Sequence, residues 1–183
     1  PSYEYIPDGE PRVFDDRLYI YGSHDRFGGD GYCLNDYVCW SAPLADLSAW
    51  RFEGTIYKKS QHPGGAAALY APDAVRGADG RYYLYYSAKD SYKISVAICD
   101  TPAGEYEYLG DVHAEDGHAC GTLPGEWMEF DPAVLVDTDG RVWLYSGTGG
   151  KAEGMNDHRV VMALAAAGCA CTVTGTDAES IKK

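Results

Sequence analysis

Three segments of the chain repeat one pattern of strands and turns, and this repeat limits the fold more than any other feature. Each segment opens with an aspartate, runs through a short apolar strand and turns at an Asp-Asp or Asp-Gly pair. An arginine then leads into a second strand in which aromatic and apolar residues alternate. A repeat longer than a hairpin and built only of strands and turns is typical of stacked or radially arranged sheets. The segments are residues 8–21, 73–86 and 131–145, with turns at Asp15-Asp16, Asp79-Gly80 and Asp139-Gly140, followed by Arg17, Arg81 and Arg141.

The leading aspartates Asp8, Asp73 and Asp131 are expected at the same edge of each unit, where a radial fold would direct them toward a common centre. The three arginines are expected to pair with neighbouring acids. Aspartates in turns hydrogen-bond their own backbone, and this role is predicted for Asp15, Asp16, Asp79, Asp137 and Asp139.

Composition excludes several classes of function. The net charge of −13 argues against binding to nucleic acid, which needs clustered Lys and Arg, and against an anionic membrane surface. No run of 18 apolar residues is present to span a bilayer. The 6 cysteines lack a C-x-x-C pair, so reduced thiols are expected and neither a metal site nor a disulfide framework is predicted. The cytoplasm is the favoured compartment; the first residue is Pro1, the chain looks cut at its start, and compartment and oligomeric state stay open.

Composition changes sharply near residue 146. The 16 Tyr, 4 Trp and 4 Phe all lie at or before Tyr145. Before this point the chain consists of strands and turns; after it, Asn156-Asp157 and Gly168 are typical of the start and end of a helix over residues 158–167. A short strand at 171–174 and a second helix from 177 are also expected. We therefore predict a partial β-propeller over residues 1–147 and a helix-containing tail over residues 148–183.

The repeat count predicts an incomplete propeller. Unit one runs from about residue 8 to 57, unit two from about 73 to 109, and unit three ends after its second strand. A propeller needs at least four blades to close. The fold class is therefore all-β, with about two and a half blades, and exposed strand edges are expected to make the chain poorly stable or prone to aggregation.

The aspartates suggest carbohydrate chemistry. Sugar hydrolysis needs one carboxyl group that activates water or attacks carbon and one that protonates the leaving oxygen. The opening PDGEPRVF and LYIYGSHD, the segment LYAPDAV and the segment FDPAVLVDTDGRVWLY resemble glycoside hydrolase family 43. That family comprises five-bladed propeller xylosidases and arabinofuranosidases, and the resemblance covers roughly residues 1–147.

The resemblance implies roles for individual residues. Asp8 falls on the general base, and Asp131 falls on the aspartate that tunes the pKa of the general acid and orients it. Asp73 lies in the second-blade motif, where Tyr70 stands at a position often occupied by Trp. Family members invert configuration, so base and acid are expected roughly 6.5–9.5 Å apart. Some members hold a calcium ion at the propeller axis, although no cluster of ligands here requires one.

The general acid of the family is a glutamate of the fourth blade, which this chain lacks. Glu126 and Glu129 precede Asp131 without matching that motif. The tail resembles the C-terminal region of EPSP synthase, a carboxyvinyl transferase of the shikimate pathway. By that resemblance Arg159, with Lys183 beyond it, would bind the anionic ligand.

Candidate substrate-binding residues are His24, Asp25, Tyr70, Asp73 and Phe130. Each also has an ordinary interpretation: a polar strand end for His24 and Asp25, core packing for Tyr70 and Phe130, and a turn or a pairing with arginine for Asp73. The reaction expected is inverting hydrolysis of terminal xylosyl or arabinofuranosyl linkages in an oligosaccharide or polysaccharide, without turnover by the isolated chain. The alternatives are a non-catalytic carbohydrate-binding fragment and a remnant of the carboxyvinyl transferase.

Overall fold

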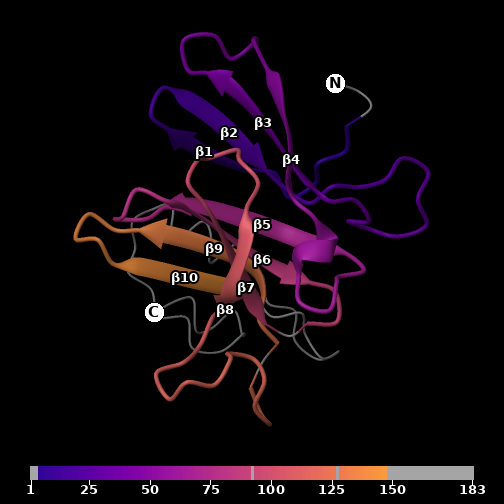
Figure 1. The fold of residues 1–183 in the computed structure, drawn as a ribbon, viewed down its shortest axis with the longest axis vertical. Helices are drawn as coiled ribbons and strands as arrows, with labels where there is room; N and C mark the ends of the chain where they lie inside the picture. Colours follow the sequence, from indigo (N-terminus) through magenta and orange to yellow (C-terminus); the bar gives the residue numbers. More distant parts are fainter. Residues whose placement is uncertain (1–3, 92, 127, 148–183) are drawn as a thin grey trace, which may run out of the picture.

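The computed structural model describes residues 4–91, 93–126 and 128–147, and the secondary structure of these ranges is almost entirely β-strand (Figure 1). A single 3₁₀ turn, Lys59–Gln61, interrupts the strands of this part of the chain. The strands are β1 (Glu10–Phe14), β2 (Arg17–Tyr21), β3 (Tyr37–Pro43), β4 (Arg51–Tyr57), β5 (Leu69–Arg76), β6 (Tyr82–Ala88), β7 (Ile94–Cys99), β8 (Glu107–Asp111), β9 (Phe130–Val136) and β10 (Val142–Gly147).

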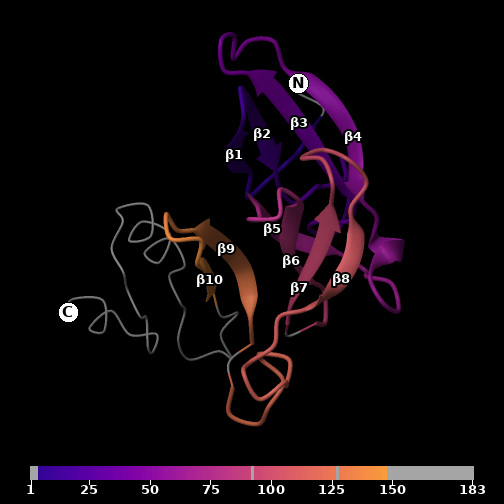
Figure 2. The same ribbon diagram turned by 60° about the vertical axis from the view of Figure 1, so that its left-hand side comes forward.

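The strands form three antiparallel sheets in which each strand pairs with the next one along the chain. Blade one is β1-β2-β3-β4, blade two is β5-β6-β7-β8, and blade three contains the pair β9-β10. Figure 2 shows the three sheets as separate layers, with the β9–β10 hairpin beside blade two and blade one above both. The prediction of about two and a half propeller blades is confirmed.

The hairpin turns form where the sequence predicts them. In blade two the amide of Gly77 donates to the carbonyl of Arg81 (2.8 Å), and Gly80 has a φ of +84°. In blade three Asp137 and Arg141 make the same bond, and Gly140 has a φ of +85°. A left-handed residue closes such turns because it matches the right-handed twist of the paired strands. The turn role predicted for Asp79 and Asp139 is confirmed, since both accept hydrogen bonds from backbone amides two residues on.

The core between blades one and two is built largely of tyrosine. Tyr21, Tyr37, Tyr57, Tyr86 and Tyr106 are all fully buried. Each phenol has a partner: Tyr57 and Tyr86 bond one another at 2.7 Å, Tyr37 donates to the carbonyl of Tyr70, and both Tyr21 and Tyr106 donate to the carbonyl of Pro102. Burial of a polar group is tolerated when it is hydrogen-bonded, which explains how alternating Tyr-rich strands can pack face to face.

The four described cysteines, Cys33, Cys39, Cys99 and Cys120, are free thiols, in agreement with the expectation of reduced cysteines. In the ranges that the structure describes, no helix is long and apolar enough to cross a membrane. The predicted helix at 158–167, the strand at 171–174, the helix from 177, and the residues Arg159 and Lys183 lie outside the described residues. The boundary expected between residues 147 and 148 stays a prediction.

Candidate active site

Blades two and three begin with the same irregularity in their first strands. The pairing of β5 with β6 shifts between Tyr70 and Asp73, and the pairing of β9 with β10 shifts where Asp131 would be paired. The bulged residues adopt left-handed backbone conformations, with φ of +25° at Ala71 and +47° at Asp131. A β-bulge beside an active site turns a side chain away from the face of the sheet on which regular alternation would place it. The residue that corresponds to Asp131 in blade two is therefore Ala71.

The expectation that Asp73 lies at the same edge as Asp8 and Asp131 is wrong. Asp73 stands two positions beyond the bulge, and only 1% of it is exposed. Its carboxylate forms an ion pair with Arg12 of β1 and accepts a hydrogen bond from the amide of Val134 in β9 (2.6 Å). The pairing of Asp73 with an arginine, one of its two ordinary interpretations, is the arrangement that the structure contains.

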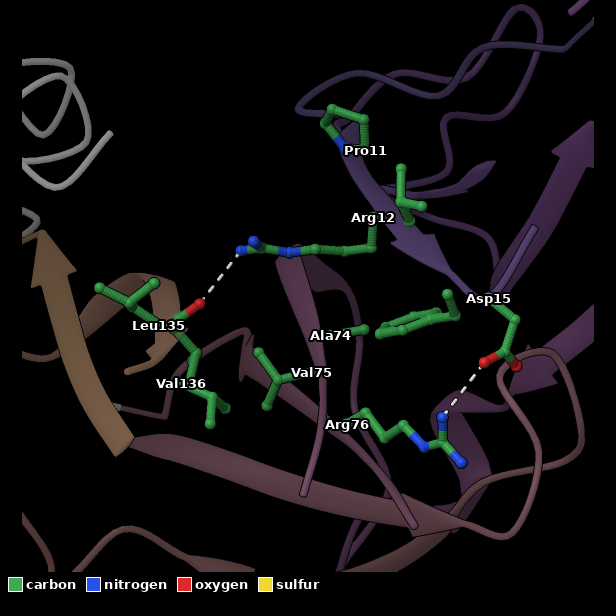
Figure 3. A pocket seen from close by; sticks show the side chains of 11 residues that line it. Pro11, Arg12, Asp15, Ala74, Val75, Arg76, Leu135 and Val136 are labelled. Atoms are coloured by element: carbon green, nitrogen blue, oxygen red, sulfur yellow. Dashed lines mark hydrogen bonds and ion pairs between the residues drawn. The ribbon is translucent and has the colours of Figure 1, made fainter. Parts of the chain in front are cut away.

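Arg12 connects three blades. Its guanidinium donates to both carboxylate oxygens of Asp73 and to the carbonyl oxygen of Val134 at 3.2 Å, the bond drawn in Figure 3. Although burial lowers the pKa of Arg12, the hydrogen bond and charge of Asp73 raise it above its ordinary value. The first strands of all three blades are thus joined by one cation and one anion.

Asp8 lies two residues before the start of β1 and is exposed. Its carboxylate accepts a hydrogen bond from the hydroxyl of Ser23 (3.2 Å), a fully buried side chain after β2. The same hydroxyl accepts a bond from the amide of Ala71 in blade two at 2.7 Å. Ser23 therefore fixes Asp8 relative to the bulge of the neighbouring blade.

The charges of Asp8 and Asp131 both act on the buried thiol of Cys33. Burial raises the pKa of Cys33, a hydrogen bond with Ser23 lowers it, and the charges of Asp25, Asp8 and Asp131 raise it further. Carboxylates from blades one and three therefore act on the same side chain. Sequence analysis expects both at one edge of the sheets, and in the structure the charges of both raise the pKa of one thiol.

Backbone strain gathers at this site. Six described residues other than glycine have positive φ, and four of them are Asp8 (+54°), Cys33 (+57°), Ala71 (+25°) and Asp131 (+47°). Such conformations persist only where the surrounding structure imposes them, and they cluster at functional sites. The strain is a reason, independent of any motif, to regard this edge as the functional one.

Tyr70 and Phe130 occupy equivalent positions, each directly before a bulged residue. Their rings lie 5.3 Å apart between centroids and are tilted by 52°. Both are half-buried, so one part of each ring packs and another part faces outward. The hydroxyl of the fully buried Tyr37 donates to the carbonyl of Tyr70 (2.7 Å) and so fixes the start of β5.

His24 and Asp25 are committed to protein partners. The two ring nitrogens of His24 lie 2.9 Å from the carbonyl oxygen of Asp36 and 3.4 Å from the carboxylate of Glu4. The carboxylate of Asp25 accepts the amide of Cys33 at 2.7 Å. The structure places both side chains beside the site, where they hold the loop that carries Cys33.

The cavity drawn in Figure 3 is lined by neither Asp8 nor Asp131. It has a volume of about 430 Å³ and lies between the far halves of β1, β5 and β9, with Phe14, Val75 and Leu135 in its wall. Arg12 and Arg76 also line it, the latter paired with Asp15 at 3.3 Å. The carboxylates and this cavity are therefore at opposite ends of the same three strands, and chemistry based on Asp8 and Asp131 belongs to the other end.

Glu126 and Glu129 have other partners. Glu126 bonds the ring of His118 at 2.7 Å and the amide of Leu123 at 3.0 Å, and Glu129 accepts a hydrogen bond from Ser146. Among the described residues no group of three His, Cys, Asp or Glu could hold a metal ion.

Sequence reasoning missed three residues of the site. Ser23, Cys33 and Arg12 carry no motif of their own, and each acts through a neighbour far away in the chain. Ser23 and Arg12 lie in the segments LYIYGSHD and PDGEPRVF that the sequence analysis singled out, but their partners Ala71 and Asp73 lie 48 and 61 residues away. For Cys33 the sequence contains no comparable signal.

Comparison with known proteins gives a consistent result. The sequence model for the family described as glycosyl hydrolases family 43 matches residues 6–178. A xylosidase/arabinosidase of Thermoclostridium stercorarium is 58% identical over 150 residues, which are 80% of this chain and 32% of that protein. Xylosidase/arabinosidase 43A of Humicola insolens is 35% identical over 154 residues, covering 78% of this chain and 43% of its own length.

Solved structures agree in fold. The GH43_1 enzyme of Xanthomonas citri complexed with xylose matches with a TM-score of 0.66 at 30% identity, over 86% of this chain and 45% of that one. A GH43 beta-xylosidase/alpha-arabinofuranosidase from a compost metagenome, in complex with xylotriose and calcium-free, matches with a TM-score of 0.63 at 30% identity. That match covers 80% of this chain and 44% of the other.

The chain spans about a third to less than half of the length of these two curated relatives. The family match continues through the tail to residue 178. The comparisons therefore give no support to the resemblance between the tail and EPSP synthase, and with it the role of Arg159 and Lys183 as anion ligands loses its basis.

Proposed function

The chain belongs to glycosyl hydrolases family 43, and we propose that its described part carries half of an inverting glycosidase site. In this proposal Asp8 is the general base and Asp131 is the carboxylate that tunes and orients the general acid. The observation that carries it is that Asp8 and Asp131 both have left-handed backbone conformations at the start of blades one and three, and that Ser23 joins Asp8 to Ala71, the residue of blade two that corresponds to Asp131.

The geometry of Asp8 suits the activation of water. Its side chain is exposed, so a water molecule can reach it, and the hydrogen bond from Ser23 holds one carboxylate oxygen while the other can accept a proton. An inverting reaction needs roughly 6.5–9.5 Å between base and acid to accommodate that water. Asp131, which belongs to a different blade, would orient that acid.

The proposed substrate is a terminal xylosyl or arabinofuranosyl unit of an oligosaccharide or polysaccharide. Relatives described as xylosidase/arabinosidase and a similar structure complexed with xylose support this class. Tyr70 and Phe130 would contact the sugar ring, because aromatic faces pack against the apolar side of a sugar. His24, Asp25 and Asp73 would act indirectly, His24 and Asp25 by holding the Cys33 loop and Asp73 by joining the blades.

The general acid is proposed to lie outside the 183 residues of this chain, in a fourth blade. Glu126 and Glu129, the glutamates nearest to Asp131 in sequence, are engaged with His118 and Ser146. We therefore expect the 183-residue chain to show no turnover of 4-nitrophenyl β-xyloside or α-arabinofuranoside above an Asp8→Ala control. Robust hydrolysis that disappears in Asp8→Ala would show that the acid is already present.

A second candidate is carbohydrate binding without catalysis, favoured by the same engagement of Glu126 and Glu129. Calorimetry with xylose and arabinose tests the sugar site directly. We expect binding at millimolar concentration, retained in Asp8→Asn and weakened at least about fivefold in Tyr70→Ala. The control is Tyr83→Ala, which removes a half-buried tyrosine of β6 that bonds Asp79. If no heat is measured for either pentose, both candidates are refuted.

A further inference from the structure

The blades pack on one another through a pattern that repeats along the chain. The second strand of each blade, β2, β6 or β10, begins at or directly after an arginine: Arg17, Arg81 and Arg141. Two and four positions after its arginine, blade one has Tyr19 and Tyr21. One and three positions after its arginine, blade two has Tyr82 and Leu84. All four side chains belong to one buried cluster, so the even positions of one blade pack against the odd positions of the next.

The same pattern continues toward blade three. Successive side chains of a strand point to opposite faces of its sheet. The even positions of blade two, Tyr83 and Tyr85, therefore lie on the face of β6 that is turned away from blade one, and β6 contacts β9 of blade three. By the same alternation the even positions of blade three, Trp143 and Tyr145, lie on the face of β10 that is turned away from blade two.

This outer side of blade three presents apolar side chains without a neighbouring blade among the described residues. Across the β9–β10 hairpin Trp143 lies opposite Leu135, and Tyr145 lies opposite Ala133. Trp143 is 42% exposed and Leu135 39%, so a large part of both side chains is open to a partner. We call this surface the trailing face; it consists of Ala133, Leu135, Trp143 and Tyr145.

Blade one has an open apolar side as well. Its odd positions, Leu18 and Ile20, lie on the face turned away from blade two. The strand registers place Val13 beside Leu18, and Ile20 in one row with Trp40 and Phe52. Val13 is 54% exposed and Phe52 50%. We call this surface the leading face; it consists of Pro11, Val13, Leu18, Ile20, Trp40 and Phe52.

The two faces are the two halves of the contact that joins blade one to blade two. The trailing face offers even positions and the leading face odd ones, and every side chain of both faces is uncharged. Apolar surfaces of this kind mark sites of interaction. A contact between unlike patches of identical chains is heterologous, and it forms a ring where the rotation closes. Propellers close with four to eight blades, and two copies of this chain would contribute six sheets.

We propose that two copies of the 183-residue chain close into one ring, with the trailing face of each copy packed on the leading face of the other. Trp143 of one protomer then lies against Leu18 and Ile20 of the other, in the way that Tyr19 lies in the buried cluster with Tyr82 and Leu84 within one chain. This inference goes beyond the proposed function, because association through these faces does not depend on sugar binding. A fourth blade in the same polypeptide would occupy the trailing face in place of the second copy.

Size-exclusion chromatography with light scattering measures the mass of the 183-residue chain in solution. At about 50 µM, above a micromolar Kd, we expect the mass of two chains of 19.9 kDa each. Val13→Glu places a charge on the leading face and Trp143→Glu on the trailing face, and each should raise the Kd at least about tenfold. The matched control is Leu109→Glu, since Leu109 of β8 is 55% exposed and belongs to neither face.

The salt dependence gives a second measurement. Each copy carries a net charge of −13 while both faces are uncharged. Raising the salt from about 0.05 M to 0.5 M therefore screens the repulsion between the copies and should tighten the dimer.

Circular dichroism first establishes that each variant is folded, and if one variant is not, the variant of the other face decides. A mass of one chain at every concentration would refute the proposal. A dimer that persists unchanged in Val13→Glu and Trp143→Glu would also refute it, since the interface would lie elsewhere. A mass that grows continuously with concentration would show that the copies add end to end, and it would overturn the closed ring.

Discussion

The ion pair between Arg12 and Asp73 is expected to contribute more to stability than any exposed pair of the described residues. Asp73 is 1% exposed, and it also accepts the amides of Val134 (2.6 Å) and Ala74 (2.7 Å). In Asp73→Ala the guanidinium of Arg12 would remain in place without its anion, and the amide of Val134 would lose its acceptor.

Breaking a buried pair by removing one partner costs about 3–5 kcal/mol. Because the side chain of Arg12 is 26% exposed, water can solvate part of its charge, so we expect a value near the lower limit, about 3 kcal/mol. For a domain of this size that corresponds to a fall in melting temperature of about 10 °C. The loss of about 3 kcal/mol is also about a fifth or more of the 5–15 kcal/mol of stability that is typical of a domain.

Thermal melting followed by circular dichroism measures this effect. The matched control is Asp100→Ala, which removes the 2.8 Å pair between Arg81 and Asp100, whose side chains are 46% and 83% exposed. An exposed pair contributes about 0–1 kcal/mol, so the control should melt within about 3 °C of the wild type. If Asp73→Ala melts as high as Asp100→Ala, the reasoning that this pair joins the blades is refuted.

Two further predictions concern pH and packing. Hydrogen bonds to Asp116 and to Glu126 raise the pKa of His118. The contribution of His118 to stability should therefore be complete below the unfolded pKa of about 6.5, and it should be lost as the pH rises through the higher folded pKa. Amide exchange in residues 113–126, corrected for base catalysis, should therefore accelerate above that pH, and equal acceleration in His118→Gln would contradict the assignment. A Cβ at Gly22 would lie 2.9 Å from the carbonyl oxygen of Pro7, so Gly22→Ala should displace the segment before Asp8. We expect this displacement to lower stability by about 1–3 kcal/mol and to weaken pentose binding. An unchanged melting temperature and unchanged binding would show that the segment can shift without loss of stability.

The order of strands and turns could be predicted because it depends on neighbours in the sequence. Asp79-Gly80 and Asp139-Gly140 form turns through their own backbone and side-chain atoms. The strand predicted at residues 51–57 has those bounds in the structure. The first strand of blade two was placed too late, at residue 73 and not at Leu69, because the bulge at Ala71 interrupts the regular alternation that marks a strand.

The same bulge explains the misplaced aspartate. In the sequence Asp8, Asp73 and Asp131 all precede a short apolar strand, so they look equivalent. Counting residues cannot reveal which position of a strand is bulged, because the bulge depends on pairing with the next strand. Once β5 and β6 pair, Asp73 points into the protein and Ala71 takes the edge position.

The sequence by itself determined a chain of antiparallel hairpins and the turn role of its Asp-Gly pairs, because these follow from local hydrogen bonding and alternation. Only the tertiary structure decided that Arg12 reaches Asp73 across 61 residues, and that Ser23 connects Asp8 to the neighbouring blade. Those contacts depend on how one sheet is placed against the next, a packing of whole blades that no short stretch of sequence encodes.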